Sequence, residues 1–262
     1  MNWATIRWRS ELLEKDTTMQ VLLPHVGTPP YPTLYLLHSL KDDSTAWLRR
    51  TQLECLVERY PVMVVMPDGY RSFYTDHAEG PPFARHIGEE VPAFIERNFP
   101  ARRERTARAI GGASMGGYGA LRVGLGYPEK FCSIHSSAGS LDRRIEFGPS
   151  AVAQSEILKH RPPSFIAEMR RIFGERPAGT QHDVLTLAEA CKARSVVPNI
   201  WIDCGTSDPL LSATRNLHQE FEAASIPHHY AEYEGTHGWE YCAARLSGAL
   251  QFHFINLGIT AT

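Results

Sequence analysis

The chain has 262 residues, of which 43% are hydrophobic and 21% charged, and its 27 basic and 29 acidic residues give a formal net charge of −2. This balance is typical of a water-soluble globular protein and argues against binding to nucleic acid, which needs clustered positive charge. The apolar runs are far too short to cross a bilayer and the first residues do not resemble a signal peptide, so we expect a soluble, cytoplasmic protein that does not bind membranes.

The predicted elements begin with a hairpin and then alternate between strand and helix. Residues 5–23 alternate loosely around a polar middle and predict an antiparallel hairpin. Short apolar runs, each followed by a polar or glycine-rich turn, predict strands buried on both faces at 34–37, 62–66, 109–110, 133–135 and 200–202. Helical patterns lie between or after them, at 45–59, 86–98, 210–224 and 239–257, although Pro92 is unfavourable inside the second. This alternation predicts an α/β fold with a mostly parallel, doubly wound sheet.

Residues 141–190 interrupt the alternation. No clear buried strand is evident there, and helical pieces surround several prolines. An insertion of this size between two core strands favours a small helical cap over a site rather than a separate domain.

The sequence Gly112-Ala113-Ser114-Met115-Gly116-Gly117 directly follows a predicted strand and precedes a helix of small residues. A serine hydroxyl is a poor nucleophile unless it is exposed and held beside a base. Glycines two positions before and after Ser114 leave room for a sharp strand-to-helix turn that exposes it. The alternative is an ordinary glycine-rich helix start, but the strand before and the helix after favour a nucleophile. A phosphate-binding loop is excluded, because no glycine loop here ends in Gly-Lys-Ser/Thr.

A serine nucleophile needs a histidine base, which in this arrangement comes late in the chain. Among the twelve histidines, His237 lies between two glycines, after a strand-like run at 229–233 and before the last helix. His228 and His229 stand at a strand start and His253 lies within the last helix, where packing roles are the simpler interpretation. We therefore expect His237 to be the base.

Three carboxylates compete for the acid that would hold this histidine. Asp208 follows the predicted strand at 200–202, near the carboxyl end where sites gather in open parallel sheets. Asp203 is still inside the strand and is interpreted as structural, and Asp183 lies in the insertion before that strand. Asp208 is the preferred candidate. Because Ser114, Asp208 and His237 come from across the chain and must meet, we expect residues 1–262 to form one catalytic domain with a cap at roughly 141–190.

Backbone N–H groups must also hold the oxyanion that forms on an attacked carbonyl. The N–H of Met115, at the start of the helix after Ser114, is one candidate. The second should come from the loop after an earlier strand, where Leu37-His38-Ser39-Leu40 offers the N–H of Leu40. His38 is expected to fix this loop by hydrogen bonding rather than to react.

These motifs together resemble the putative-esterase branch of the α/β-hydrolases, which contains tributyrin esterases, S-formylglutathione hydrolase (esterase D), feruloyl and acetyl-xylan esterases, and mycolyltransferases. The resemblance covers nearly the whole chain and is closest to the tributyrin-esterase members. It rests on the runs 34–43, 47–51, 64–69, 72–76, 112–117, 127–131, 173–174, 203–208 and 235–239.

The resemblance implies an α/β-hydrolase fold, a triad of Ser114, Asp208 and His237, and oxyanion donors at Leu40 and Met115. Two positions depart from the family. Ser39 stands where a glycine is usual, so its side chain could crowd the substrate or turn the Leu40 N–H. Cys242 stands where a second tryptophan is frequent, which is expected to alter packing under the last helix rather than chemistry.

The sequence therefore predicts a serine carboxylesterase that acts on short-chain acyl esters through an acyl-enzyme. S-formylglutathione hydrolysis and the removal of acetyl or feruloyl groups from carbohydrate stay open, as does acyl transfer to another alcohol. A non-catalytic binding protein on the same scaffold is the remaining alternative. Trp47, Tyr74 and Phe173 are candidate substrate-binding residues, each equally compatible with plain core. No cofactor or metal is expected, since no histidine–carboxylate cluster has ligand spacing, and a homo-oligomer is possible.

Overall fold

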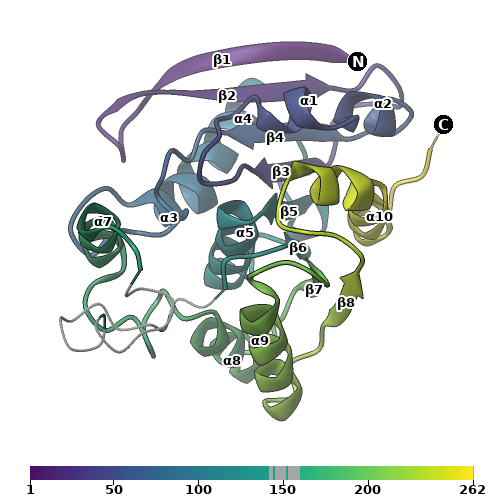
Figure 1. The fold of residues 1–262 in the computed structure, drawn as a ribbon. Helices are drawn as coiled ribbons and strands as arrows, with labels where there is room; N and C mark the ends of the chain where they lie inside the picture. Colours follow the sequence, from purple (N-terminus) through teal and green to yellow (C-terminus); the bar gives the residue numbers. More distant parts are fainter. Residues whose placement is uncertain (142–143, 145–151, 153–159, 262) are drawn as a thin grey trace.

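An eight-stranded sheet runs through the computed structural model, which describes residues 1–141, 144, 152 and 160–261 (Figure 1). The strands are β1 (Asn2–Ser10), β2 (Lys15–Leu23), β3 (Thr33–Leu37), β4 (Met63–Pro67), β5 (Arg108–Ala113), β6 (Ser133–Ser137), β7 (Asn199–Gly205) and β8 (His229–Tyr233). Their order in the sheet is β1-β2-β4-β3-β5-β6-β7-β8. The hairpin of β1 and β2 is antiparallel and β2 pairs antiparallel with β4, whereas β4, β3 and β5 to β8 are parallel neighbours. The predicted hairpin and mostly parallel sheet are confirmed.

The helices lie between the strands as the alternation predicts. They are α1 (Ala46–Arg50), α2 (Leu53–Val57), α3 (Phe83–Arg85), α4 (Val91–Asn98), α5 (Met115–Gly126), α7 (Pro163–Phe173), α8 (Val184–Ala193), α9 (Leu211–Ala223) and α10 (Trp239–Leu257). The single helix predicted at 45–59 is wrong in detail, because Thr51 adopts an extended conformation and divides it into α1 and α2.

Pro92 does not end the second predicted helix, which runs from Phe83 to Asn98 through a π-helical turn at His86–Glu90. At the end of this turn the N–H of Val91 donates to the carbonyl of His86, five residues back. Pro92 has no N–H and takes the first turn of α4, where none is needed. The wider turn therefore accommodates the proline without a break.

Alternate residues of the central strands enter two separate cores. On β3, Leu34 and Leu36 belong to a cluster with residues of α1, α2 and α10. Tyr35 and Leu37, which point to the other face, belong to a cluster with residues of α4, α5, α7, α8 and α9. Because both faces are covered, every residue of β3 to β6 is buried, and this explains why the sequences of β3 and β4 do not alternate between apolar and polar.

The predicted insertion at 141–190 includes α7, which lies at the outer left of the molecule in Figure 1, and most of α8. Residues 142–143, 145–151 and 153–159 of this prediction lie outside the described residues. The carboxyl-terminal part packs onto the main domain: Val184, Ala188 and Cys191 of α8 enter the core beside α5, and the Cys191 thiol donates to the carbonyl of Leu125 at 3.1 Å. The existence of a cap over the site stays a prediction.

None of the helices within the described part of the chain is long and apolar enough to cross a membrane.

Several histidines are buried in a neutral state, and this predicts acid sensitivity. Burial, together with the guanidinium of Arg122, lowers the pKa of His182 to about 4, and burial holds the pKa of His253 well below its ordinary value. In the unfolded chain a histidine titrates near pH 6.5, so between about pH 6.5 and 4 the unfolded state binds protons that the folded state does not. The free energy of unfolding should therefore fall as the pH drops through 6.5, by up to about 1.4 kcal/mol per pH unit for each such histidine.

Urea denaturation between pH 7.5 and 4.5 measures this slope. His182→Gln keeps a side-chain amide that can form a hydrogen bond with Thr75 but cannot take up a proton, so its free energy of unfolding should depend less steeply on pH. A wild-type protein equally stable at pH 7.5 and 4.5 would contradict the prediction.

Candidate active site

Ser114 stands at the sharp turn between β5 and α5. Its backbone has φ +56° and ψ −112°, a conformation that side-chain-bearing residues rarely adopt and that is found mainly at functional sites. The turn is held by the Ser114 N–H, which donates to the carbonyl of Ser137 at the end of β6 at 3.0 Å. The hydroxyl is thereby placed beyond the carboxyl end of the sheet.

Two glycines make this turn possible by allowing close backbone approach. A Cβ atom on Gly112 would lie 2.3 Å from the carbonyl oxygen of Gly116, and one on Gly116 would lie 2.2 Å from that of Leu37. Both contacts are with backbone atoms, which cannot move aside as a flexible side chain can. The glycines two before and two after Ser114 are therefore required by the fit of three segments: the end of β5, the start of α5 and the loop after β3.

The structure brings Ser114, His237 and Asp208 together in a continuous hydrogen-bonded chain. Ser114 Oγ lies 3.0 Å from His237 Nε2, and His237 Nδ1 lies 2.7 Å from Asp208 Oδ2. Since a carboxylate only accepts, Nδ1 carries the proton and Nε2 is free to accept from the serine hydroxyl. The Asp208 side chain is fully buried, while that of His237 is 33% exposed. An oriented histidine that reaches the surface can serve as a base for an incoming molecule.

The loops after β7 and β8 are joined to each other, and this sets the position of both residues. The Ser207 N–H donates to the carbonyl of Gly235 at 2.9 Å. The second carboxylate oxygen of Asp208 accepts from the Leu210 N–H at 2.7 Å, which fixes the side chain toward His237. The competing carboxylates are engaged elsewhere: Asp183 caps the start of α8, and Asp203 is buried in the sheet.

The loop after β3 lies against the start of α5. His38 fixes it, as the sequence predicts: its Nε2 accepts from the Gly69 N–H at 2.9 Å, and its carbonyl accepts from the Tyr74 hydroxyl at 3.1 Å. Leu40, the predicted oxyanion donor, follows in this loop and is partly buried. Met115, the other predicted donor, is the first residue of α5, so its N–H has no acceptor within the helix.

The three predicted substrate-binding side chains lie in the core. Trp47, Tyr74 and Phe173 are 3%, 0% and 2% exposed, so they offer a bound molecule almost no surface. Trp47 donates from Nε1 to the carbonyl of Leu37 at 3.2 Å, and Tyr74 holds His38. Both therefore support the loop of Leu40 from beneath, whereas Phe173 packs on Phe73 in the core.

Cys242, the second position where the sequence was expected to depart from the family, contributes to packing under α10. Cys242 is buried in the cluster with α10, and burial raises the pKa of its thiol to about 12. It therefore stays protonated and inert, as expected from the sequence.

A buried polar network lies under the site, around Asp203. Its carboxylate is fully buried and contacts His135 Nε2 at 2.6 Å, and it accepts from the Tyr241 hydroxyl at 2.7 Å and the Ser137 hydroxyl at 3.0 Å. The backbone of Ser137 in turn accepts from the Ser114 N–H. The sequence predicted a structural Asp203 but not its partners, which come from β6 and α10.

Arg122 is a second supporting residue that sequence reasoning missed. It is 4% exposed on α5 and donates to Thr75 Oγ1 at 3.1 Å and to Gln181 Oε1 at 2.8 Å. It thus joins the loop after β4 and the segment before α8 to the helix that begins at Ser114. The available signal was a charged residue in the middle of an otherwise small and apolar helix.

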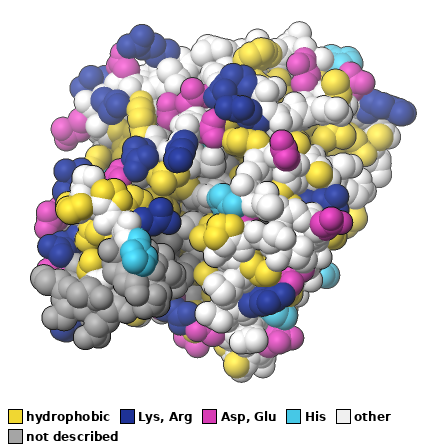
Figure 2. All heavy atoms as spheres, in the orientation of Figure 1, with side chains coloured by type: hydrophobic (Ala, Val, Ile, Leu, Met, Phe, Trp, Pro, Cys, Tyr) yellow, Lys and Arg dark blue, Asp and Glu magenta, His cyan; other side chains and the backbone are white. Residues whose placement is uncertain are grey.

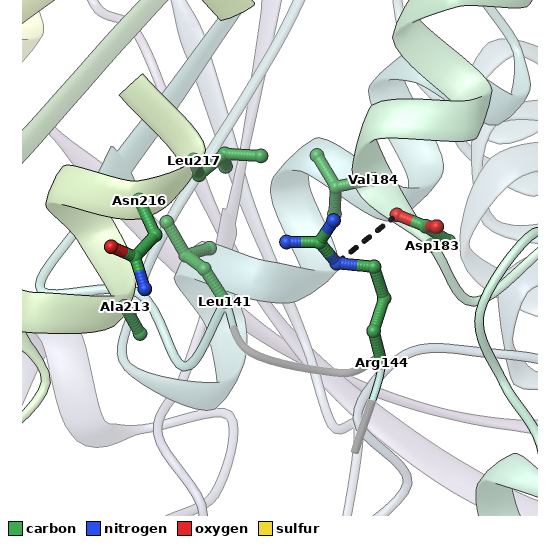
Figure 3. A pocket seen from close by; sticks show the side chains of 7 residues that line it. All are labelled: Leu141, Arg144, Asp183, Val184, Ala213, Asn216 and Leu217. Carbon is green, nitrogen blue, oxygen red and sulfur yellow. Dashed lines mark ion pairs between the residues drawn. The ribbon is translucent and has the colours of Figure 1, made fainter. Parts of the chain in front are cut away.

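A cavity of about 40 Å³ lies between the segment after β6 and the starts of α8 and α9 (Figure 3). It is lined by Leu141, Arg144, Asp183, Val184, Ala213, Asn216 and Leu217. The Ser140 N–H, next to Leu141, donates to the carbonyl of Ser114 at 3.0 Å, so one wall of the cavity begins beside the Ser114 turn. Arg144 is paired with Glu220 at 2.6 Å and lies 3.9 Å from Asp183. Among the described residues, two carboxylates therefore lie around the Arg144 guanidinium.

Figure 2, drawn in the orientation of Figure 1, shows a hollow near the centre of the visible face, with a histidine at its edge and Lys and Arg side chains gathered to its left. Within the described part of the chain, no group of three or more His, Cys, Asp or Glu side chains is placed to hold a metal ion.

The family model and the relatives that match this chain are all described as esterases. A family model described as putative esterase matches residues 10–253. An acetyl esterase of Caldicellulosiruptor saccharolyticus is 30% identical over 261 residues, which cover 94% of this chain and 96% of that protein. Esterase Rv1288 of Mycobacterium tuberculosis is 28% identical, with coverage of 88% of this chain but only 54% of the mycobacterial protein, so the chain spans about half of its length.

Solved structures agree on the fold. FphF, a fluorophosphonate-binding serine hydrolase of Staphylococcus aureus, superposes with a TM-score of 0.83 at 24% identity, covering 96% of this chain and 98% of that one. An S-formylglutathione hydrolase (FrmB) of the same organism gives a TM-score of 0.82 at 23% identity, covering 96% and 98%. On the family match and the acetyl esterase relative, the chain belongs to the putative esterase family and is a carboxylic ester hydrolase with the α/β-hydrolase fold.

Proposed function

We propose that the protein is a serine esterase that hydrolyses short-chain acyl esters through Ser114, His237 and Asp208. The observation that carries this is the hydrogen-bonded chain from Ser114 Oγ to His237 and on to the buried Asp208, with links of 3.0 and 2.7 Å. Asp208 holds His237 in the tautomer that leaves Nε2 free to accept a proton.

In the first half of the reaction, Ser114 Oγ attacks the ester carbonyl carbon while its proton passes to His237 Nε2. The protonated His237 is stabilised by Asp208 and then gives this proton to the departing alcohol oxygen. The acyl group remains on Ser114. A water molecule, deprotonated by His237, attacks the acyl-enzyme and releases the carboxylic acid and the free serine.

The negative charge on the carbonyl oxygen needs donors placed before the reaction. We assign this role to the N–H groups of Met115 and Leu40. Two observations support the assignment: Met115 opens α5, whose positive end faces Ser114, and the loop of Leu40 packs against α5 at Gly116.

Short acyl groups are the substrates that the comparisons favour. The relative from Caldicellulosiruptor saccharolyticus, 30% identical over 94% of this chain, is an acetyl esterase. This similarity supports acetyl and similarly short esters as substrates.

The contact made by the Ser39 side chain argues against a binding protein without activity. A Ser39 side chain that filled the oxyanion position would block the site. Its hydroxyl instead donates to Asp42 within the same loop at 2.8 Å.

Labelling with a fluorophosphonate probe tests the proposal. The probe phosphonylates an activated serine, so we expect one label per chain, located on Ser114 by peptide mass spectrometry, and protection by excess p-nitrophenyl acetate. A folded wild-type protein that stays unlabelled would contradict the proposed mechanism.

The same preparation then separates the possible substrates. Rates should fall along a series of p-nitrophenyl esters from acetate to octanoate. S-formylglutathione, feruloyl and acetylated-sugar esters, and product analysis with added alcohols, distinguish the other hydrolases and acyl transfer. A preference for octanoate would contradict the assignment to short acyl chains.

A further inference from the structure

The carboxylate of Asp42 connects two loops of the site that are far apart in the sequence. Its Oδ2 atom accepts from the Ser39 hydroxyl at 2.8 Å and from Trp239 Nε1 at 2.8 Å. Ser39 precedes Leu40 in the loop after β3, whereas Trp239 opens α10 two residues after His237. The Asp42 side chain is only 10% exposed, so these hydrogen bonds are shielded from competing water.

A second contact joins the same two loops. The ring of Trp239 packs edge-on against that of Trp47, with centroids 5.0 Å apart. Trp47 in turn donates from Nε1 to the carbonyl of Leu37. The tryptophan pair therefore links the start of α10 to the end of β3, beside the link that the Asp42 hydrogen bonds make to the loop of Leu40.

The connection matters because the residues it joins act on one reacting carbonyl. The Leu40 N–H must meet the oxygen of that group while His237 moves a proton beside its carbon. Donors displaced by about 1 Å from a developing oxyanion lose much of their effect, since the interaction depends on preformed geometry. The Asp42 carboxylate also holds the hydroxyl of Ser39, the residue directly before Leu40.

We propose that Asp42 is a positioning residue, which holds the loop of the oxyanion donor Leu40 in register with the loop of the base His237. The inference rests on the proposed function, since it assumes that these residues act on an ester. Asp42 itself touches neither the substrate nor the reacting atoms. Arg49, whose Nη2 lies 3.5 Å from Asp42 Oδ1, contributes charge to the carboxylate from the outer side.

Three substitutions test this contact, one for each of its three members. Asp42→Ala removes the acceptor, Trp239→Phe removes one donor but keeps a ring to pack on Trp47, and Ser39→Ala removes the other donor. We expect Asp42→Ala to lower kcat for p-nitrophenyl acetate about tenfold with KM within about twofold, and each donor variant to lower it less. Asp43→Ala is the matched control: it removes an exposed carboxylate from the adjacent position, whose partners are Thr45 and Arg49, and should leave kcat unchanged.

A readout specific to geometry separates positioning from mere stability. A short alkyl boronic acid forms a tetrahedral adduct with an active serine and resembles the transition state, so its affinity should fall in Asp42→Ala by the same factor as kcat/KM. Since the acceptor and donor act as one contact, Asp42→Ala combined with Trp239→Phe should lose less than the product of the two single effects. All rates are measured well below each variant's melting temperature.

Wild-type rates and boronate affinity in a folded Asp42→Ala variant would overturn the inference, as would an equal loss in Asp43→Ala. If Asp42→Ala does not fold, Trp239→Phe and Ser39→Ala decide by the same criteria. Failure of the proposed function itself has a different signature, because fluorophosphonate labelling of the wild-type protein would then be absent.

Discussion

Replacing Ser114 by alanine is expected to reduce kcat for p-nitrophenyl acetate by about 10⁴- to 10⁶-fold. The variant keeps the proposed oxyanion donors and the rest of the site but has no atom to carry the acyl group, so only their residual contribution remains. The loss should appear in kcat rather than in KM, because the hydroxyl acts in the transition state and contributes little to ground-state binding. Steady-state kinetics with purified protein measure it.

Ser207→Ala provides the matched control for this loss. Ser207 is exposed in the loop of Asp208, and the hydrogen bond that holds the loop there comes from its backbone rather than its hydroxyl. Its removal should leave kcat within about twofold of the wild-type value. Native turnover in Ser114→Ala would show that another residue attacks the ester, and fluorophosphonate labelling of that variant would locate it.

The parts of the fold that sequence predicted well are those encoded locally. The strands β3 to β7 are apolar runs ended by turns, and the Ser114 turn is encoded by glycines whose missing Cβ atoms the structure explains. The order of serine, acid and histidine left only the later histidines, and the glycines around His237 selected it; the structure places it 3.0 Å from Ser114 Oγ. Apart from this order, these signals lie within a few residues of the feature they predict.

Features that depend on contacts between distant segments could not be predicted in the same way. The contact of Asp42 with Trp239 joins residues 197 positions apart, and nothing near Asp42 indicates its partner. Burial also determines the role of an aromatic residue, because residue type alone is compatible with either a pocket or the core. Trp47 and Tyr74 resemble pocket residues in sequence, but they lie beneath the loop of Leu40 and support it.

The π-helical turn is a local feature that the sequence also did not predict. Pro92 argued against a continuous helix, but the extra residue in the turn at His86–Glu90 lets the chain pass it. Glu90 of this turn accepts from the Ser10 hydroxyl at 2.6 Å, at the end of β1. The local cost of the irregular turn is thus offset by a contact with the hairpin, 80 residues away in the chain.

Replacing Asp203 by alanine is expected to lower the free energy of unfolding by about 3–5 kcal/mol, because three buried groups would each lose a hydrogen-bond partner at a cost of about 1–3 kcal/mol each. His135 Nε2, 2.6 Å away, and the hydroxyls of Tyr241 and Ser137 would all lose their acceptor. Because these side chains are buried, water could not replace the lost hydrogen bonds without opening the core. Urea denaturation at pH 7.5 measures the loss, and a lower melting temperature should accompany it.

The control for this prediction is an ion pair at the surface. Asp16 lies 3.5 Å from Arg7 in the hairpin, and both side chains are at least half exposed. Asp16→Ala should therefore change the free energy of unfolding by less than about 1 kcal/mol. Asp203→Asn should fall between the two, since its amide oxygen can still accept from Tyr241, but its NH₂ group cannot accept from His135 Nε2. If Asp203→Ala were as stable as Asp16→Ala, the network would be dispensable to the core. The Ser114 turn, whose N–H is held by the carbonyl of Ser137, would then depend on the β6 backbone alone.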